Sequence, residues 1–233
     1  MKKLFKVLIF LLLIGISIAL LFVNNGYNMY KEAIEDTPLE EKVAQIQGKE
    51  NYTKFSELPQ MYVNAVISVE DKRFYEHNGI DLIAIGRAAI NDIKAMSYVE
   101  GGSTITQQLA KNMYFTQEKK IERKIAEVFM AWKIEDNYSK QGIFELYVNT
   151  IYFGDGYYTV KDACKGYFNK DLQDMSDGEC ILLAGIPNAP SAYAPTKNPE
   201  LARQRQKQVI EKMIKNGYLT QDQASKILEE GVI

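Results

Sequence analysis

The feature that most constrains this chain is an apolar run close to its N-terminus. Seventeen uncharged residues run from Val7 to Val23, and the charged residues that precede them are Lys2, Lys3 and Lys6. About 20 helical residues, at 1.5 Å of rise each, cross a hydrocarbon core of roughly 30 Å, and the apolar pair before Lys6 extends the run to that length. The sequence therefore predicts a membrane-spanning anchor over residues 7–23.

The flanking charges predict how the anchor is oriented. Lysines precede it and Asn24 to Tyr30 carries no charge, so the positive-inside rule places the basic residues 1–6 in the cytoplasm. A cleaved signal peptide is the alternative, but its apolar region is normally about 7–15 residues long and ends in a small-x-small cleavage site. Leu20 to Val23 offers no such site. We therefore expect a single-pass anchor in the cell membrane, with the rest of the chain on the extracellular (periplasmic) side.

The membrane also divides the charge of the chain. The full sequence has 28 basic and 30 acidic residues, a net charge of −2, and without the three N-terminal lysines the remainder has a net charge of −5. The chain therefore lacks the overall positive charge that is typical of a nucleic-acid-binding protein. A single histidine excludes a multi-histidine metal site, and two cysteines are too few for a disulfide scaffold. Because Cys164 and Cys180 lie in apolar helical patterns, we expect buried thiols rather than a disulfide.

Helical signals dominate the part of the chain after the anchor. Residues 24–54 are polar and uneven, which is typical of a stalk, and residues 55–233 are long enough for one mainly α domain with its own core. Apolar residues at i, i+3, i+4 and i+7 predict a helix from Pro59 to about Glu70. Capping boxes predict that further helices begin after Ser176 and Thr220.

Three polar clusters are candidates for chemistry, and the first is residues 70–79. Glu70 and Asp71 are adjacent acids at the end of an apolar helix, where the helix dipole disfavours negative charge. An environment of this kind is expected to raise the pKa of a carboxyl group, which is what a general base that works near neutral pH needs. The alternative is an inert surface charge run, neutralised by Lys72 and Arg73.

The second cluster is residues 101–112. Two glycines and several hydroxyl residues lead into a helix, for which Thr104 and Gln107 form a capping box. Free amide groups at the start of a helix bind anions, and Gln107 and Lys111 lie one turn apart, so an amide and a cation could reach the same anion. An ordinary capped helix explains these residues equally well.

The third cluster is residues 111–133, which carry three more positive than negative charges in an otherwise acidic domain. Arg123 and Glu127 share one helix face, and Lys124 lies three residues from Glu127. A solvated helix held by such pairs is the alternative, but the apolar residues 128–132 predict that this helix is buried. A pair of acids, an anion-binding helix start and a cationic helix beside a membrane favour glycosyl chemistry on a lipid-linked phosphate or diphosphate.

These clusters resemble motifs of the peptidoglycan glycosyltransferases, glycosyltransferase family 51, which polymerise lipid II. Residues 70–79 match E-D-x-x-F-x-x-H-x-G, residues 101–112 match G-G-S-T-I-T-Q-Q-L-x-K-N, and residues 123–127 match R-K-x-x-E. Two later segments are similar to the fourth and fifth motifs, residues 143–149 (I-x-E-x-Y-x-N) and residues 182–191, where Asn188 replaces the more usual glutamine. The order and spacing of five motifs make the resemblance specific.

The resemblance implies a mainly α, lysozyme-like fold with two lobes, a head and a smaller membrane-facing jaw behind the transmembrane helix. Apolar residues in 80–85 and 113–115 are candidates for the jaw, with ordinary core as the equal alternative. The resemblance also implies that the 4-hydroxyl of lipid II attacks the anomeric carbon of a lipid-linked glycan. That carbon inverts, a β-1,4 bond forms and polyprenyl diphosphate leaves.

The resemblance further implies roles for individual residues. Glu70 matches the general base, and Glu127 matches a second essential carboxylate near the leaving diphosphate. Lys111, Arg123 and Lys124 match phosphate-binding positions. The other expected substrate contacts are Ser103, Thr104, Gln107, Gln108, Asn112 and Lys119, the last at a position where relatives can carry arginine. Asp71 and His77 are expected to support the first motif. No cofactor is required, although a divalent cation (Mg or Mn) at the diphosphate is compatible with the family.

The expected partners are lipid II, lipid-linked glycan, the membrane, and proteins of cell-wall synthesis or division, with no nucleic acid. The sequence contains no Ser-x-x-Lys and no Lys-Thr-Gly, so a monofunctional transglycosylase is expected rather than one with a penicillin-binding domain. A fragment of a longer protein is the alternative. Two other functions stay open at this point, a lysozyme-like glycan hydrolase and a non-catalytic scaffold that binds lipid II.

Overall fold

The computed structural model describes residues 2–95, 101–116, 118 and 120–231, and this part of the chain contains helices and no strand. The mainly α prediction is therefore confirmed. Three short 3-10 helices occur at Phe55–Glu57, Leu172–Asp174 and Ile186–Asn188. The α-helices are α1 (Lys2–Asp36), α2 (Leu39–Gln47), α3 (Gln60–Glu70), α4 (Leu82–Ala95), α5 (Ile105–Tyr114), α6 (Ile121–Asn137), α7 (Lys140–Val148), α8 (Val160–Phe168), α9 (Asp177–Gly185), α10 (Pro190–Tyr193), α11 (Pro199–Lys215) and α12 (Gln221–Glu230).

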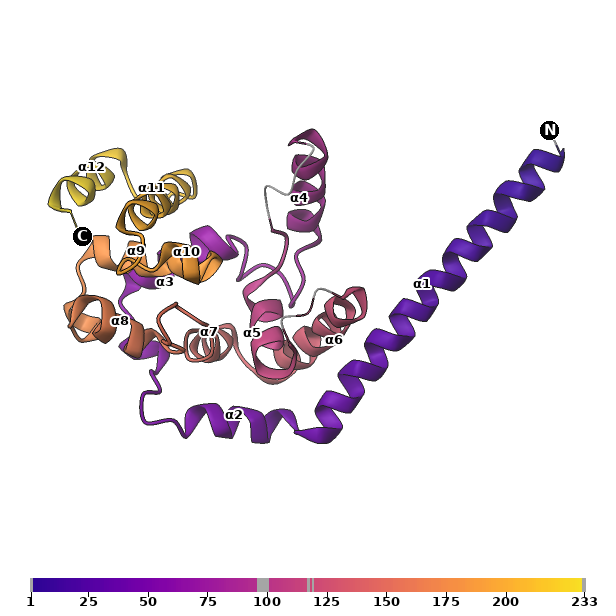
Figure 1. Ribbon diagram of the computed structural model, residues 1–233, viewed down its shortest axis with the longest axis horizontal. Coiled ribbons are helices and arrows are strands. Elements are labelled where there is room, and N and C mark those ends of the chain that lie inside the picture. Colours follow the sequence, from indigo (N-terminus) through magenta and orange to yellow (C-terminus); the bar gives the residue numbers. More distant parts are fainter. Residues whose placement is uncertain (1, 96–100, 117, 119, 232–233) are drawn as a thin grey trace.

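The N-terminal helix α1 extends far from the rest of the molecule (Figure 1). Among the described residues, it is the one helix long and apolar enough to cross a membrane, and its most apolar window has a mean hydropathy of 2.9 with none of it buried. Such a helix fits the predicted anchor over residues 7–23 by length and composition.

The segment predicted as a stalk, residues 24–54, is largely helical in the structure. Its first part continues α1, and its second part forms α2. Leu39, Val43 and Ile46 of α2 are buried in the hydrophobic core. Their spacing places them on one face of a short helix, which gives this segment an apolar surface to pack. The segment therefore lies against the domain.

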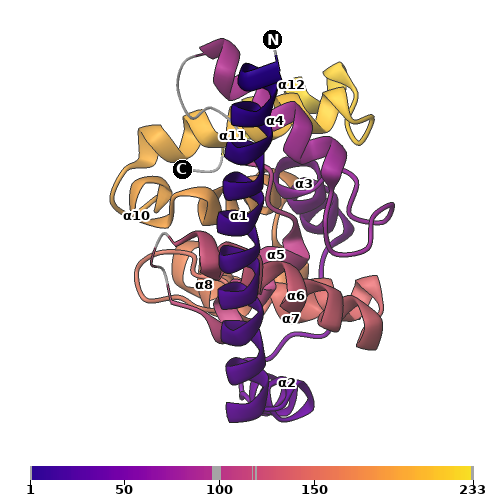
Figure 2. The same ribbon diagram turned by 90° about the vertical axis from the view of Figure 1, so that its right-hand side faces the viewer.

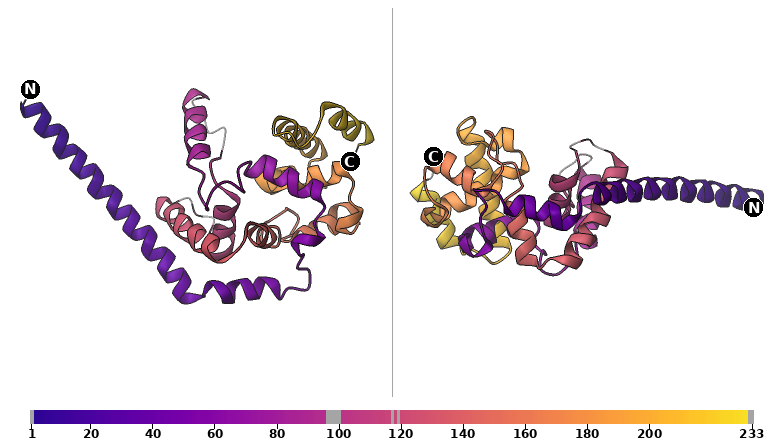
Figure 3. Two further views of the ribbon diagram at one scale, coloured as in Figure 1. Left: turned by 180° about the vertical axis from the view of Figure 1, so that it is seen from behind. Right: turned by 90° about the horizontal axis from the view of Figure 1, so that it is seen from below.

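Most of the other helices form two groups (Figures 1 and 3). In the first group α3, α9 and α11 pack on one another and α12 packs on α9 and α11. In the second group α5 packs on α6 and α7, and α1 packs along α6. A continuous core joins the groups, with Tyr62, Phe74, Phe144 and Tyr147 among its largest fully buried side chains. This arrangement agrees with the two-lobed prediction.

Helix α4 stands apart from both groups, on the same side as the N-terminal half of α1 (Figures 1 and 2). Its large exposed apolar side chains are Leu82, Ile83, Ile85, Ile90 and Ile93. Residues 113–115, the other jaw candidate, lie against the core instead. Met113 is buried, and Tyr114 and Phe115 are partly buried against the core. Of the two candidate segments, the structure therefore leaves only the one in α4 exposed.

Local signals in the sequence set several helix boundaries correctly. Capping boxes begin α5 at Thr104, α9 at Ser176 and α12 at Thr220. The two cysteines are free and buried, as predicted. Burial raises the pKa of Cys164 to about 11 and that of Cys180 to about 12, so both thiols stay protonated at neutral pH.

Candidate active site

Glu70 is the last residue of α3, and its side chain is 9% exposed. The helix carries it to the edge of the core because the preceding apolar residues bury most of α3. Its Oε2 accepts a 2.8 Å hydrogen bond from Nε2 of Gln108 on α5. Its Oε1 is buried and has no hydrogen-bond partner among the described residues. One oxygen is thus fixed, and the other is free to accept a proton.

Asp71, the neighbouring acid, has a different set of partners. Its Oδ2 accepts a 3.0 Å hydrogen bond from the backbone amide of Ile105, at the start of α5. The same oxygen lies 2.9 Å from Nε2 of His77. Asp71 therefore joins the end of α3 to the start of α5, which is the supporting role predicted for it, and His77 faces Asp71.

The start of α5 is built from buried polar side chains. Thr104 Oγ1 donates a 2.7 Å hydrogen bond to the carbonyl of Gly79, and the backbone amide of Gln107 lies 3.1 Å from the same hydroxyl. Gln107 Oε1 in turn accepts from the Thr104 amide. Because Thr104 and Gln107 are only 1% and 2% exposed, both side chains have a clear structural role. Their contact with substrate stays a prediction.

The cationic helix α6 carries a buried ion-pair network around Glu127, which is 1% exposed. Arg123 Nη1 pairs with one carboxylate oxygen, and Lys124 Nζ lies 2.9 Å from the other. Lys124 also donates a 2.6 Å hydrogen bond to Ser103 Oγ, just before α5. The second and third motifs are thus in direct contact, and Glu127 holds two cations in place.

Lys111 connects this network to Glu70. It is half-buried on α5, and burial lowers the pKa of its amine. Glu127 and Glu70 oppose that shift, while Arg123 and Lys124 add to it. These four charged groups are therefore within electrostatic range of Lys111. A bound anion would favour the cationic form of this lysine, which burial alone disfavours.

The structure gives less detail for two further residues that are expected to contact substrate. Asn112 is half-buried on α5, next to Lys111. Lys119 lies outside the described residues.

Arg205 on α11 is a neighbour of Glu70 that the sequence analysis missed. Its Nη2 lies 3.9 Å from Glu70 Oε1, and the side chain is 9% exposed. Its Nε donates a 3.1 Å hydrogen bond to the carbonyl of Gly185, where a Cβ would approach Arg205 Cγ to 2.9 Å. A signal was present, because Arg205 falls at helical spacing between the buried residues Ala202 and Val209. A charged residue on an apolar face needs a partner.

The fourth motif supplies structural contacts and one contact near the site. Tyr147 is fully buried, and its hydroxyl lies 3.5 Å from Gln108 Oε1. Burial raises the pKa of Tyr147 and the charge of Glu70 raises it further, so the phenol stays protonated as a donor. Glu145 and Asn149 instead bind the backbone of residues 53–55.

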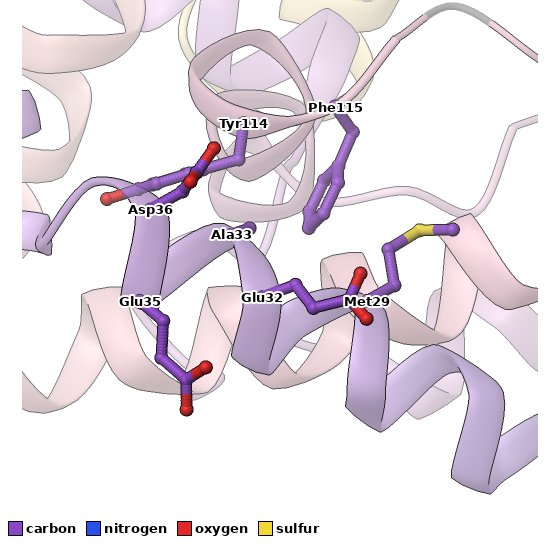
Figure 4. Close-up of a pocket in the computed structure, with 7 residues that line it drawn as sticks. All are labelled: Met29, Glu32, Ala33, Glu35, Asp36, Tyr114 and Phe115. Atoms are coloured by element: carbon purple, nitrogen blue, oxygen red, sulfur yellow. The ribbon is translucent and has the colours of Figure 1, made fainter.

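A separate pocket of about 530 Å³ lies where the end of α1 meets the end of α5. Figure 4 shows its lining, with Glu35 pointing away from Phe115. It is lined by Met29, Glu32, Ala33, Glu35, Asp36, Tyr114 and Phe115. Neither Glu70 nor Glu127 contributes to it, so it is distinct from the candidate active site.

The donor groups near the diphosphate-binding candidates do not suit a protein-held metal ion. Both oxygens of Glu127 are engaged by Arg123 and Lys124. Over the described ranges, no group of three or more His, Cys, Asp or Glu side chains could hold a metal. Divalent cations prefer several free oxygen ligands.

Comparison with known proteins identifies relatives of this chain. A family model described as Transglycosylase matches residues 38–214. The chain is 44% identical over 191 residues to penicillin-binding protein 1A of Neisseria lactamica, covering 81% of this chain and 24% of that protein. It is 46% identical over 175 residues to penicillin-binding protein 1A of Aquifex aeolicus, covering 75% and 24%. A crystal structure of penicillin-binding protein 1A from Haemophilus influenzae aligns with a TM-score of 0.48 and 20% identity, over 78% of this chain and 18% of that one. The chain spans about a quarter of the length of the curated relatives it matches.

Proposed function

The chain belongs to the transglycosylase family, and from this membership we propose that it is a peptidoglycan glycosyltransferase that polymerises lipid II into β-1,4-linked glycan. The observation that carries the proposal is that α5 and a residue just before it link the two acidic groups. Gln108 of α5 donates a hydrogen bond to Glu70, and Ser103 accepts one from Lys124, which pairs with Glu127. A candidate base and a candidate diphosphate-binding group therefore belong to one site.

In the proposed reaction Glu70 Oε1 takes the proton of the acceptor 4-hydroxyl. Gln108 holds the other oxygen of the carboxylate, so the free oxygen keeps a fixed direction. The hydroxyl oxygen attacks the anomeric carbon of the lipid-linked donor, and that carbon inverts. The bond from this carbon to the diphosphate breaks, and its electron pair leaves with the polyprenyl diphosphate.

The diphosphate gains negative charge as it leaves, and cations stabilise that charge. Lys111, Arg123 and Lys124 are the proposed groups. Glu127 acts through two of them, because its carboxylate pairs with both Arg123 and Lys124. Positioning together with charge stabilisation accounts for most of the catalysis when the leaving group is a phosphate.

We place this reaction at the outer face of the cell membrane, with α1 as the anchor and its N-terminus in the cytoplasm. The exposed apolar side chains of α4 are the proposed membrane contact of the jaw. They support this placement because α4 stands on the same side as the N-terminal half of α1 (Figure 1). A large exposed apolar surface marks a site of membrane or protein contact.

Incubation of the full chain in vesicles with purified lipid II tests the proposal. Long glycan products on a gel, together with released polyprenyl diphosphate, are expected. Cleavage of preformed glycan without polymer would instead identify a hydrolase. Binding of lipid II with neither reaction would identify a scaffold.

A further inference from the structure

Opposite faces of helix α6 make different contacts. Arg123 and Glu127 lie on the face that belongs to the candidate active site. The opposite face carries Glu122, Ile125 and Phe129 at spacings of three and four residues, and it packs against α1. Figures 1 and 2 show the two helices side by side. The predicted membrane anchor thus rests directly on the back of the helix that carries the diphosphate-binding candidates.

The two helices cross at Gly26, which is buried. A Cβ built on Gly26 would lie 2.6 Å from both Cβ and Cγ2 of Ile125 and 2.9 Å from the carbonyl oxygen of Glu122. Distances of this size are too short for any side chain, so the crossing requires glycine. Gly15, the other glycine of α1, has nothing within 4 Å of such a Cβ.

Aromatic contacts extend the interface beyond the crossing. The rings of Tyr27 and Phe129 lie 5.2 Å apart, and those of Tyr30 and Phe129 lie 5.9 Å apart. Trp132 packs edge-on against Phe129 at 5.6 Å and is 42% exposed. Tyrosine and tryptophan are enriched where a membrane meets water. The composition of this cluster therefore fits a position at the membrane surface.

The crossing lies close to the end of the predicted span. Gly26 lies three positions after Val23, which corresponds to about 4.5 Å along a helix. Ile125, the partner of Gly26, is adjacent in sequence to Lys124 and follows Arg123 by two residues. The diphosphate of a membrane lipid lies at the boundary between hydrocarbon and water. The crossing therefore holds the two cations near the level of that diphosphate.

We propose that the contact between Gly26 and Ile125 sets the depth of the α6 cations relative to the membrane, and that Gly26 is a positioning residue for a lipid-linked diphosphate substrate. This inference rests on the proposed function. The anchor then has a second role besides attaching the domain to the membrane: it fixes the height at which Arg123 and Lys124 meet a membrane-embedded substrate.

Gly26→Leu tests the inference, with Gly15→Leu as the matched control in the same helix. Each variant is reconstituted in phosphatidylglycerol vesicles and assayed with lipid II on its long polyprenyl chain and on a short, water-soluble chain. For Gly26→Leu we expect KM for the long-chain substrate to rise about tenfold, with kcat and the short-chain kinetics nearly unchanged. Gly15→Leu should match the unmodified protein. Equal long-chain KM values in the two variants would overturn the inference.

Fluorescence gives a readout that does not depend on activity. The chain has one tryptophan, Trp132, and it packs on Phe129, the α6 residue whose ring contacts two tyrosines of α1. Nitroxide groups on lipid headgroups should quench it more strongly than nitroxides deep in the acyl chains. Gly26→Leu should weaken the headgroup quenching, and Gly15→Leu should not. If the unmodified chain forms no polymer but shows this pattern, the proposed function fails and the depth assignment stands. Headgroup quenching that is unchanged in Gly26→Leu would overturn the depth assignment.

A double variant separates a specific contact from general damage to the fold. Gly26→Ala alone places a methyl group 2.6 Å from two atoms of Ile125 and 2.9 Å from the Glu122 carbonyl oxygen. Ile125→Gly removes the first two contacts and leaves the third. We therefore expect Gly26→Ala/Ile125→Gly to restore part of the long-chain KM that Gly26→Ala loses. A double variant no better than Gly26→Ala would overturn the assignment of Ile125 as the main contact.

Discussion

Gln108 fixes one oxygen of Glu70 and leaves the other free. Its Nε2 donates a 2.8 Å hydrogen bond to Glu70 Oε2, while Glu70 Oε1 has no hydrogen-bond partner among the described residues. A second contact orients the amide of Gln108, because its Oε1 lies 3.5 Å from the hydroxyl of Tyr147. A chain of three side chains, anchored at the fully buried Tyr147, therefore sets the direction of the proposed base.

Gln108→Leu should lower kcat for polymerisation by about 100-fold, because Glu70 loses the hydrogen bond that orients it. Lipid II binding should change much less, and pre-steady-state kinetics with a binding assay separate the two effects. Gln107→Leu is the matched comparison, since it breaks a capping box and should cost about 1 kcal/mol of stability. A Gln108→Leu variant with raised KM and normal kcat would show that this residue binds substrate instead.

Lys111→Ala should weaken binding of lipid-linked diphosphate by about tenfold or more, since a charge-assisted contact is lost. The affinity of the unmodified protein should also fall as pH rises. Burial lowers the pKa of Lys111, so its charge is present below that value and is lost above it, at a lower pH than for an ordinary lysine.

Lys111→Arg should remove this pH dependence, because arginine titrates only above about 12. Isothermal titration at several pH values measures it. Lys120→Ala is the control, since Lys120 is exposed and pairs with Glu118. Equal losses in Lys111→Ala and Lys120→Ala would indicate a general effect of charge.

Glu127→Gln should abolish polymerisation and weaken diphosphate binding, because Arg123 and Lys124 lose the carboxylate that holds them. Stability should fall by about 1–3 kcal/mol, as expected when buried charged groups lose a hydrogen-bond partner. Glu135→Gln is the control on the same helix, since Glu135 pairs with Lys140 and bonds Thr106. Thermal unfolding should show a similar loss of stability in both variants. A binding assay should show weaker diphosphate binding in Glu127→Gln alone.

Arg205→Met should lower kcat for polymerisation. The guanidinium lies 3.9 Å from Glu70 Oε1, and its hydrogen bond to the Gly185 carbonyl holds α11 beside that carboxylate. Steady-state kinetics with lipid II measure the effect. Arg203→Met, two residues away on α11 and paired with Glu200, should have a normal kcat. Equal kcat values in the two variants would contradict a role for Arg205 at the site.

The parts of the fold that follow from short-range patterns were predictable. The apolar spacing before Glu70 predicts α3, and the pairs that begin at Thr104, Ser176 and Thr220 predict helix starts, because each signal acts within one or two turns. The pairing of Glu127 with Arg123 and Lys124 also follows from helical spacing.

The parts that depend on tertiary packing were not predictable. Gln107 and Gln108 are adjacent and identical, and only the orientation of α5 against α3 decides that Gln108 reaches Glu70 while Gln107 closes a capping box. Arg205 lies 135 residues after Glu70, so no local pattern links the two. The helical packing of the predicted stalk depends on the surface that α6 offers to α1.

The most direct test of the account is Glu70→Gln, assayed for lipid II binding and for polymerisation in the same preparation. The carboxamide keeps the shape of the side chain and can still accept from Gln108, but it cannot take a proton. We predict that binding survives and that the rate of polymerisation falls by at least about 100-fold. Glycan synthesis at the rate of the unmodified protein would contradict the assignment of Glu70 as the base.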